Sequence, residues 1–145
     1  MALEHVLLRD FKTEINTGTE AVPNWVEILG IAGGPVHKPK TTTKSVASNK
    51  SGGRQDERVT NRGDSYSLKG QRIEDPNTGA RDPGQEAVEA AAGLIGYNST
   101  KQYRITSPGN VAKVFKATTE ATESGGSEDD FCDWSFDITV CGSYQ

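Results

Sequence analysis

The stretch 132–140 reads Cys-Asp-Trp-Ser-Phe-Asp-Ile-Thr-Val, and apolar and polar side chains alternate along it without a break. A period of two is typical of a β-strand with one face on a core and the other in water. Trp134, Phe136 and Ile138 make its apolar face bulky, so we expect these three side chains in the core. The polar face carries Asp133 and Asp137. We expect a core strand over 131–141 whose acidic face serves a contact and not catalysis.

Other stretches of β character are shorter. Trp25 leads a bulky apolar run and is expected to join the core. A Ser-Pro-Gly-Asn turn at 107–110 separates two further strands. The expected strands lie at 3–15 (through Leu7, Phe11 and Ile15), 25–29, 66–73, 103–106 and 111–121.

One segment has the marks of a helix, which we expect over 82–95. Asp82 is a good N-cap, Pro83 suits the first helical position, and Gln85 completes a capping box. Gly96 provides the C-terminal stop. One apolar face is expected from the i, i+3, i+4, i+7 positions Val88, Ala91, Ala92 and Ile95. The order of elements predicts a mainly β (α+β) fold with one flanking helix.

Bulk composition limits the class of protein. The chain has 145 residues, 33 % of them hydrophobic, and 16 glycines, which fits a single domain (1–145) with a thin core. No apolar run approaches the roughly 20 residues that span a membrane, and residues 1–12 lack a signal-peptide core. We therefore expect a soluble product of a cytoplasm. Cys132 and Cys141 would lie roughly 30 Å apart on one strand, so we expect two free thiols.

Charge is unevenly distributed along the chain. Residues 36–62 hold seven basic side chains against Asp56 and Glu57, a local charge of +5 that leaves −9 for the remainder of a chain of net charge −4. From residue 117 to residue 145 there are acidic residues but no Lys or Arg. The basic side chains are Lys38, Lys40, Lys44, Lys50, Arg54, Arg58 and Arg62.

The same segment, 36–63, is poor in apolar residues. It cannot bury enough apolar area to offset the entropy of ordering it alone, and a structureless loop of this length is unusual in a compact domain. We expect an arm that is mobile in the monomer. Its Thr-rich stretch 41–43 and the stretch 58–60 could pair as a hairpin once something holds them.

Enzyme chemistry finds little support in this sequence. His5 and His37 have no partner spacing for a metal or a triad, and the glycines at 30–34 lack the Lys-Ser/Thr of a phosphate loop. The acidic run 128–130 suits a solvated turn better than a divalent cation site. We predict no catalytic residues, no cofactor and no metal.

Two kinds of binding protein remain. The basic arm could neutralise nucleic-acid phosphates in a small β-fold module. It holds no Phe, Tyr or Trp for base stacking, however, and the acidic remainder would repel the same polyanion. Pairing the arm with an acidic surface of another copy uses both parts of the charge distribution, so self-association is favoured.

The order of these features resembles the major tail tube proteins of long-tailed, non-contractile bacteriophages. The resemblance extends over the whole chain. It rests on Trp25-Val26-Glu27-Ile28, on 75–79 (Asp-Pro-Asn-Thr-Gly) leading through 81–85 into the helix, on 105–109 (Ile-Thr-Ser-Pro-Gly), and on 133–138 (Asp-Trp-Ser-Phe-Asp-Ile).

This resemblance implies two packed antiparallel β-sheets (a sandwich or barrel-like fold) with a flanking helix. It also implies a virion protein, made in the host bacterial cytoplasm, whose hexameric rings stack into a tube. The arm 36–63 would reach neighbouring subunits and rings. The expected partners are further copies of the chain, the tape measure protein and DNA in the lumen, and the tail tip and tail terminator proteins.

A lumen that passes DNA is expected to be acidic or neutral. We predict that strands 66–73 and 113–120 line it, with Glu74 and Glu120 as the best candidates. The lysines at 69, 113 and 116 must then face subunit contacts or pair with acids.

Overall fold

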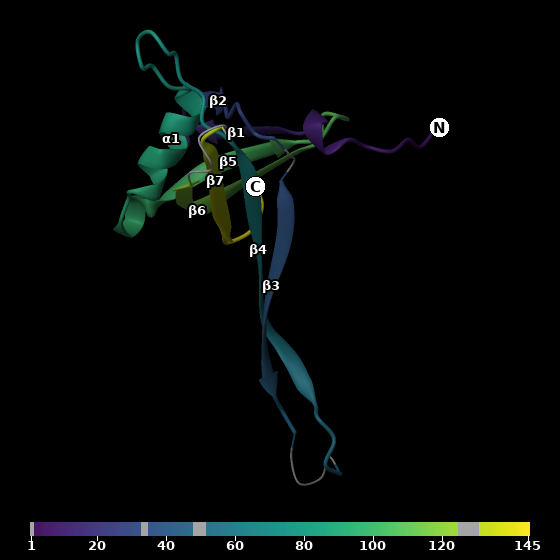
Figure 1. Ribbon diagram of the computed structural model, residues 1–145. Coiled ribbons are helices and arrows are strands. Elements are labelled where there is room, and N and C mark those ends of the chain that lie inside the picture. Colours follow the sequence, from purple (N-terminus) through teal and green to yellow (C-terminus); the bar gives the residue numbers. More distant parts are fainter. Residues whose placement is uncertain (1, 33–34, 48–51, 125–130) are drawn as a thin grey trace.

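Seven strands form one antiparallel sheet in the order β2-β1-β5-β6-β7-β4-β3 (Figure 1). The computed structural model describes residues 2–32, 35–47, 52–124 and 131–145. The strands are β1 (Lys12–Asn16), β2 (Trp25–Glu27), β3 (Val36–Ser45), β4 (Glu57–Gln71), β5 (Thr100–Thr106), β6 (Ala112–Ser124) and β7 (Asp133–Cys141). The helical elements are α1 (Pro83–Ala92) and two short 3-10 turns, η1 (Leu8–Asp10) and η3 (Gly96–Ser99).

The expected mainly β fold with one flanking helix is confirmed, but the strands are not divided between two sheets. β4 pairs with β7 on one side and with β3 on the other, so the ladder runs unbroken from β2 to β3. In Figure 1 β3 and β4 run across the direction of β5 and β6. Strand twist accumulates across a sheet, so a single twisted sheet wraps the core that two sheets were expected to enclose.

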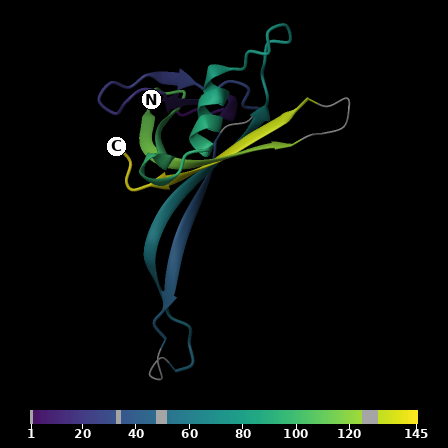
Figure 2. The ribbon, with the colours of Figure 1, turned by 90° about the vertical axis from the view of Figure 1, so that its left-hand side faces the viewer.

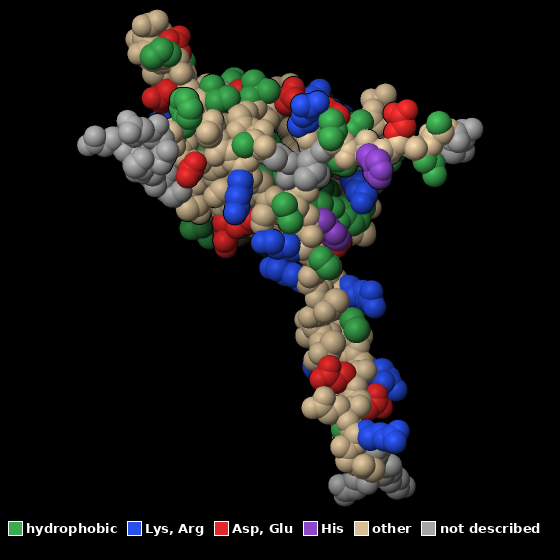
Figure 3. Space-filling model, turned by 45° about the vertical axis from the view of Figure 1, so that its right-hand side comes forward, with side chains coloured by type: hydrophobic (Ala, Val, Ile, Leu, Met, Phe, Trp, Pro, Cys, Tyr) green, Lys and Arg blue, Asp and Glu red, His purple; other side chains and the backbone are tan. Residues whose placement is uncertain are grey.

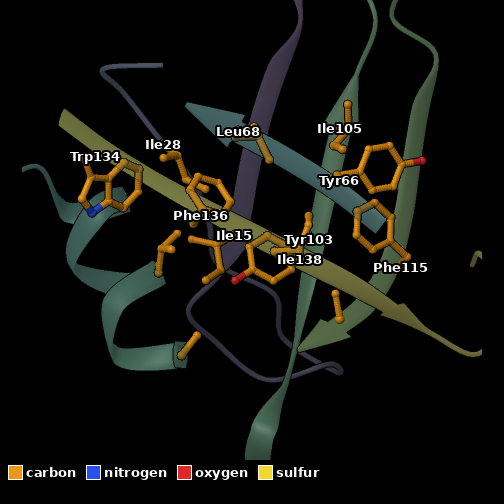
Figure 4. Packing of buried hydrophobic residues seen from close by; sticks show 13 residues of the cluster. Ile15, Ile28, Tyr66, Leu68, Tyr103, Ile105, Phe115, Trp134, Phe136 and Ile138 are labelled. Carbon is orange, nitrogen blue, oxygen red and sulfur yellow. The ribbon is translucent and has the colours of Figure 1, made fainter. Parts of the chain in front are cut away.

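The core lies on one face of this sheet, under α1. On β7, Trp134, Phe136 and Ile138 are at most 1 % exposed, and all three point into the cluster drawn in Figure 4. Asp133, just before Trp134, and Asp137, between Phe136 and Ile138, are exposed. The alternation at 132–140 therefore does separate the core face of β7 from its outer face, as predicted.

Trp25 does not join that core. It pairs in register with Asn16 and is only half-buried, whereas its neighbour Val26 lies opposite Ile15 and packs against the core. The guanidinium of Arg104 lies 4.5 Å above the indole ring. Strand parity, which bulk alone does not reveal, places Trp25 on the opposite face.

Helix α1 begins as expected and ends early. The Asp82 carboxylate accepts a hydrogen bond from the Gln85 backbone N–H at 3.2 Å, and Val88 and Ala91 are buried. The helix ends at Ala92, with Gly93 as its cap. Ile95, expected on the apolar face of the helix, therefore lies beyond its end and is 92 % exposed.

The Gln85 side chain does not close a capping box. Its fully buried amide donates to the carbonyls of Leu29 (3.0 Å) and Gln71 (2.9 Å) and accepts from the N–H of Ile73 (3.1 Å). This one buried side chain therefore has both its polar atoms satisfied, and it supplies a partner to three part-buried backbone groups. It ties the segment after β2 to the end of β4.

The opening strand is shorter than predicted. Only Lys12–Asn16 pairs with neighbouring strands, and Leu3 and Leu7 are 91 % and 50 % exposed. Both cysteines are free, as expected, and both are exposed. Within the described residues, no helix is long and apolar enough to cross a membrane.

The arm forms the hairpin that the sequence left open, with Thr43 opposite Val59. Residues Val36–Ser45 pair with β4 over ten positions, and the resulting hairpin projects far from the body (Figures 1 and 2). Backbone ladder bonds need no apolar side chains. The inner half of β4 is anchored in the core by Tyr66 and Leu68, so the outer half extends a ladder that has already formed.

Candidate assembly surface

The basic side chains of the arm are sorted by strand register. Residues directly opposite each other in an antiparallel pair share a face. Lys38 lies opposite Ser65, Lys40 opposite Gly63 and Lys44 opposite Arg58. We call the face that carries Lys38, Lys40, Lys44 and Arg58 the basic face of the arm.

Arg62 lies opposite Thr41, on the other face of the hairpin. Arg54 precedes β4 in the chain, and Lys50 falls outside the described residues. Figure 3 shows blue side chains distributed along the arm and few red ones.

The basic face is open to a partner. Every side chain of β3 is exposed. Lys44 and Arg58 are like charges directly opposite each other, an arrangement that costs free energy. Arg58 offsets part of this by pairing with Asp56. An anionic surface placed against this face would relieve the remainder.

A hydrogen-bonded cluster holds the base of the arm. The His37 Nε2 lies 2.6 Å from one carboxylate oxygen of Asp64, and the Tyr144 hydroxyl donates to the other at 2.9 Å. The hydroxyls of Tyr66 and Tyr144 lie 2.8 Å apart. The bond to His37, with that from Tyr144, lowers the pKa of Asp64. Burial and the bonds to Tyr66 and Asp64 raise the pKa of Tyr144. The cluster joins both strands of the arm to the segment after β7.

The sheet face that points away from the core is polar. Glu120 lies opposite Asp137, which lies opposite Ser67, and the Ser67 hydroxyl donates to Asp137 at 2.5 Å. The rows on either side are made mostly of hydroxyl side chains: Thr118, Thr139 and Ser65 on one side, a row that continues into Lys38 of the arm, and Thr122, Ser135 and Lys69 on the other. We call these three rows the polar face.

The two lumen candidates are not brought together. Glu120 lies on the polar face, but Glu74 lies beyond β4, where it pairs with Arg72 at 3.1 Å. Sequence reasoning missed Asp137 as the neighbour of Glu120. The alternation at 132–140 put Asp137 on the outer face, but its pairing partner depends on the register between β6 and β7.

Lys69, Lys113 and Lys116, which were expected to face subunit contacts or pair with acids, have different surroundings. Lys116 pairs with Glu20 at 3.0 Å, and this bond lowers the pKa of the Glu20 carboxyl. Lys113 lies 5.8 Å from the ring centre of Tyr144, at the base of the arm. Lys69 is exposed on the polar face.

Two strand edges are open for pairing with another chain. β3 is the last strand of the sheet, so one side of its backbone is free over the described residues. β6 pairs with β5 only as far as Thr118, and from there to Ser124 its described partner is β7 alone. Unpaired edges are templates for strand addition.

The sequence matches no protein-family model and no curated protein. Solved structures do match in fold. A chain from the tail of an empty GTA particle, refined with C6 symmetry, matches with a TM-score of 0.65 and 14 % identity over 94 % of this chain and 95 % of that one. A chain from the virion of a native gene transfer agent (GTA) particle matches with a TM-score of 0.63 and 14 % identity, over 94 % of both chains.

A third match comes from the six-fold symmetrised baseplate of the anti-feeding prophage. Its TM-score is 0.53 at 11 % identity, over 100 % of this chain and 92 % of that one. At such low identities, these likenesses establish the fold. It is a fold found in chains of phage-like tail particles.

Proposed function

We propose that this chain is a structural tail protein, the tail tube subunit of a long-tailed, non-contractile phage or phage-like particle. Its copies form six-fold rings that stack into a hollow tube, and DNA passes through that tube during ejection. The observation that carries the proposal is the arm, a ten-residue strand with every side chain exposed, held on a rigid base. This strand buries no side chain in its own chain, and only His37 at its base bonds through its side chain to the rest of the cluster.

The arm suits a contact between rings. Ten strand residues extend roughly 33 Å, enough to cross onto a neighbouring subunit. Its basic face matches the acidic remainder of another copy, and the attraction between them would also guide docking.

The open edges suit ring closure. The edge of β3 and the edge of β6 beyond Thr118 are different surfaces, so pairing one to the other is a head-to-tail contact. A head-to-tail contact generates a ring when its rotation closes and a helical filament when it does not. The C6 symmetry of the similar GTA tail supports closure at six copies.

The polar face suits a lumen. Its hydroxyl side chains are neutral, and Glu120 and Asp137 repel phosphates, so DNA would slide without binding. Lys69 would meet an acid of a neighbouring copy. Glu74 lies outside the polar face, where it pairs with Arg72 of its own chain. The tape measure protein and DNA would occupy this channel, and the tail tip and terminator proteins would bind its two ends.

Negative-stain microscopy of the concentrated full-length protein tests this function, with tail tips added if it stays monomeric. Rings or tubes support it. The competing function is nucleic-acid binding by the basic face, and it predicts a monodisperse particle that shifts a labelled DNA or RNA probe. A monomer that does so, and does not assemble even on tips, would replace our proposal.

A further inference from the structure

Two apolar surfaces on this chain have no role in the contacts described above. The first is the N-terminal segment 2–7, which we call the strap. Leu3, Val6 and Leu7 are 91 %, 60 % and 50 % exposed, and the strap forms no strand. In Figure 1 it leads away from the body on the side opposite α1.

The second surface is a groove of about 240 Å³ between α1 and the end of β1. Its apolar lining comes from Ile15, Ala87, Ala90, Ala91 and Leu94. Two large exposed side chains follow the lining residue Leu94 in the chain: Ile95 is 92 % exposed and Tyr97 is fully exposed. Scattered apolar side chains are normal on a surface, but a lined groove with two exposed neighbours marks a binding site.

The strap cannot fill the groove of its own chain in this fold. Figure 1 places the start of the chain and α1 on opposite sides of the body. A second copy can bring the two surfaces together, because a head-to-tail ring joins opposite ends of successive subunits.

Length and charge fit this pairing. Six extended residues span roughly 20 Å, against roughly 15 Å for the ten-residue α1. The strap carries Glu4 between its apolar residues, and Lys101 stands at the rim of the groove. A neighbour's strap lying in the groove would bury apolar area on both sides and pair these two charges.

We propose that the strap of one copy binds the groove of the next copy in the ring. The inference rests on the self-assembly proposed above and adds a contact that strand pairing does not require. It makes the groove a binding site for a short apolar peptide with an acidic residue, and the peptide is residues 2–7 of this same chain.

Cysteine cross-linking tests the contact directly. In full-length protein carrying Cys132→Ser and Cys141→Ser, Leu3→Cys is combined with Ala90→Cys. Oxidation of the assembled protein should give a ladder of linked chains on a non-reducing gel. The matched control combines Leu3→Cys with Phe131→Cys, since Phe131 is also exposed (75 %) but lies outside the groove. It should give no ladder.

A charge swap gives a second, independent readout. Glu4→Lys should raise the protein concentration needed for assembly about tenfold, and Lys101→Glu in the same chain should restore it.

The inference is wrong if rings or tubes form while the Leu3→Cys, Ala90→Cys pair stays unlinked. It is equally wrong if the linked product is a single chain. If the unmodified protein forms no assembly even on tail tips, the proposed function itself fails, and the inference fails with it.

Discussion

Replacing Trp134 with alanine should produce one of the largest losses of stability available in this chain. The side chain is 1 % exposed and belongs to the core cluster, at the end that lies beside α1 in Figure 4. Its ring stands 5.1 Å from that of Phe136, and its indole N–H donates to Glu89 at 3.2 Å.

The magnitude follows from these contacts. Truncating a buried Trp to Ala costs about 3–5 kcal/mol, because apolar burial is lost and a cavity remains. Glu89 keeps its ion pair with Arg81, so the lost indole bond adds little. A loss of about 4 kcal/mol should lower Tm by roughly 10–20 °C in a chain of this size.

Urea unfolding followed by far-UV circular dichroism, on protein too dilute to assemble, measures the effect. Trp25→Ala is the matched control: the same chemical change at a half-buried site should cost about 1–2 kcal/mol. Asp133→Ala, on the exposed face of β7, should change stability by about 0.5 kcal/mol or less and weaken assembly if that face is a contact. Equal losses for Trp134→Ala and Asp133→Ala would refute our separation of the two faces.

Three further changes test other parts of the account. Gln85→Leu should cost about 1–3 kcal/mol in urea unfolding, because it leaves three part-buried backbone groups without their side-chain partner. Since His37 lowers the pKa of Asp64, the stability from that pair is fully present above the ordinary value of 3.8 and is lost as pH falls through the lowered pKa. Proteolysis of the arm should rise over that acid range, and Asp64→Asn should abolish the dependence. Lys44→Glu with Arg58→Glu should slow assembly and flatten its dependence on salt, both measured by light scattering.

Local patterns in the sequence predicted those features that depend only on neighbouring residues. The alternation around Trp134 identified the inward face of β7 because strand parity is a local property. Asp82 identified the start of α1, since capping involves only neighbouring residues. Both depend on a few consecutive positions.

Long-range pairing was beyond those patterns. The parity of Trp25 depends on its register against Asn16, and the role of Gln85 depends on backbone groups 12 to 56 positions away. The arm was expected to be mobile in the monomer because its composition is polar, with 41–43 and 58–60 able to pair as a hairpin. That hairpin is present, because ladder hydrogen bonds extended outward from an anchored β4 do not depend on apolar side chains, and the mobility of the arm stays a prediction.

A cryo-electron microscopy map of the assembled full-length protein is the most direct test of the central claim. We expect stacked six-fold rings whose channel is lined by the polar face, with Glu120 and Asp137 turned toward the axis and the arm of each copy lying on the adjacent ring. A protein that stays monomeric even on tail tips, or a tube whose channel is lined by the basic face of the arm, would contradict it.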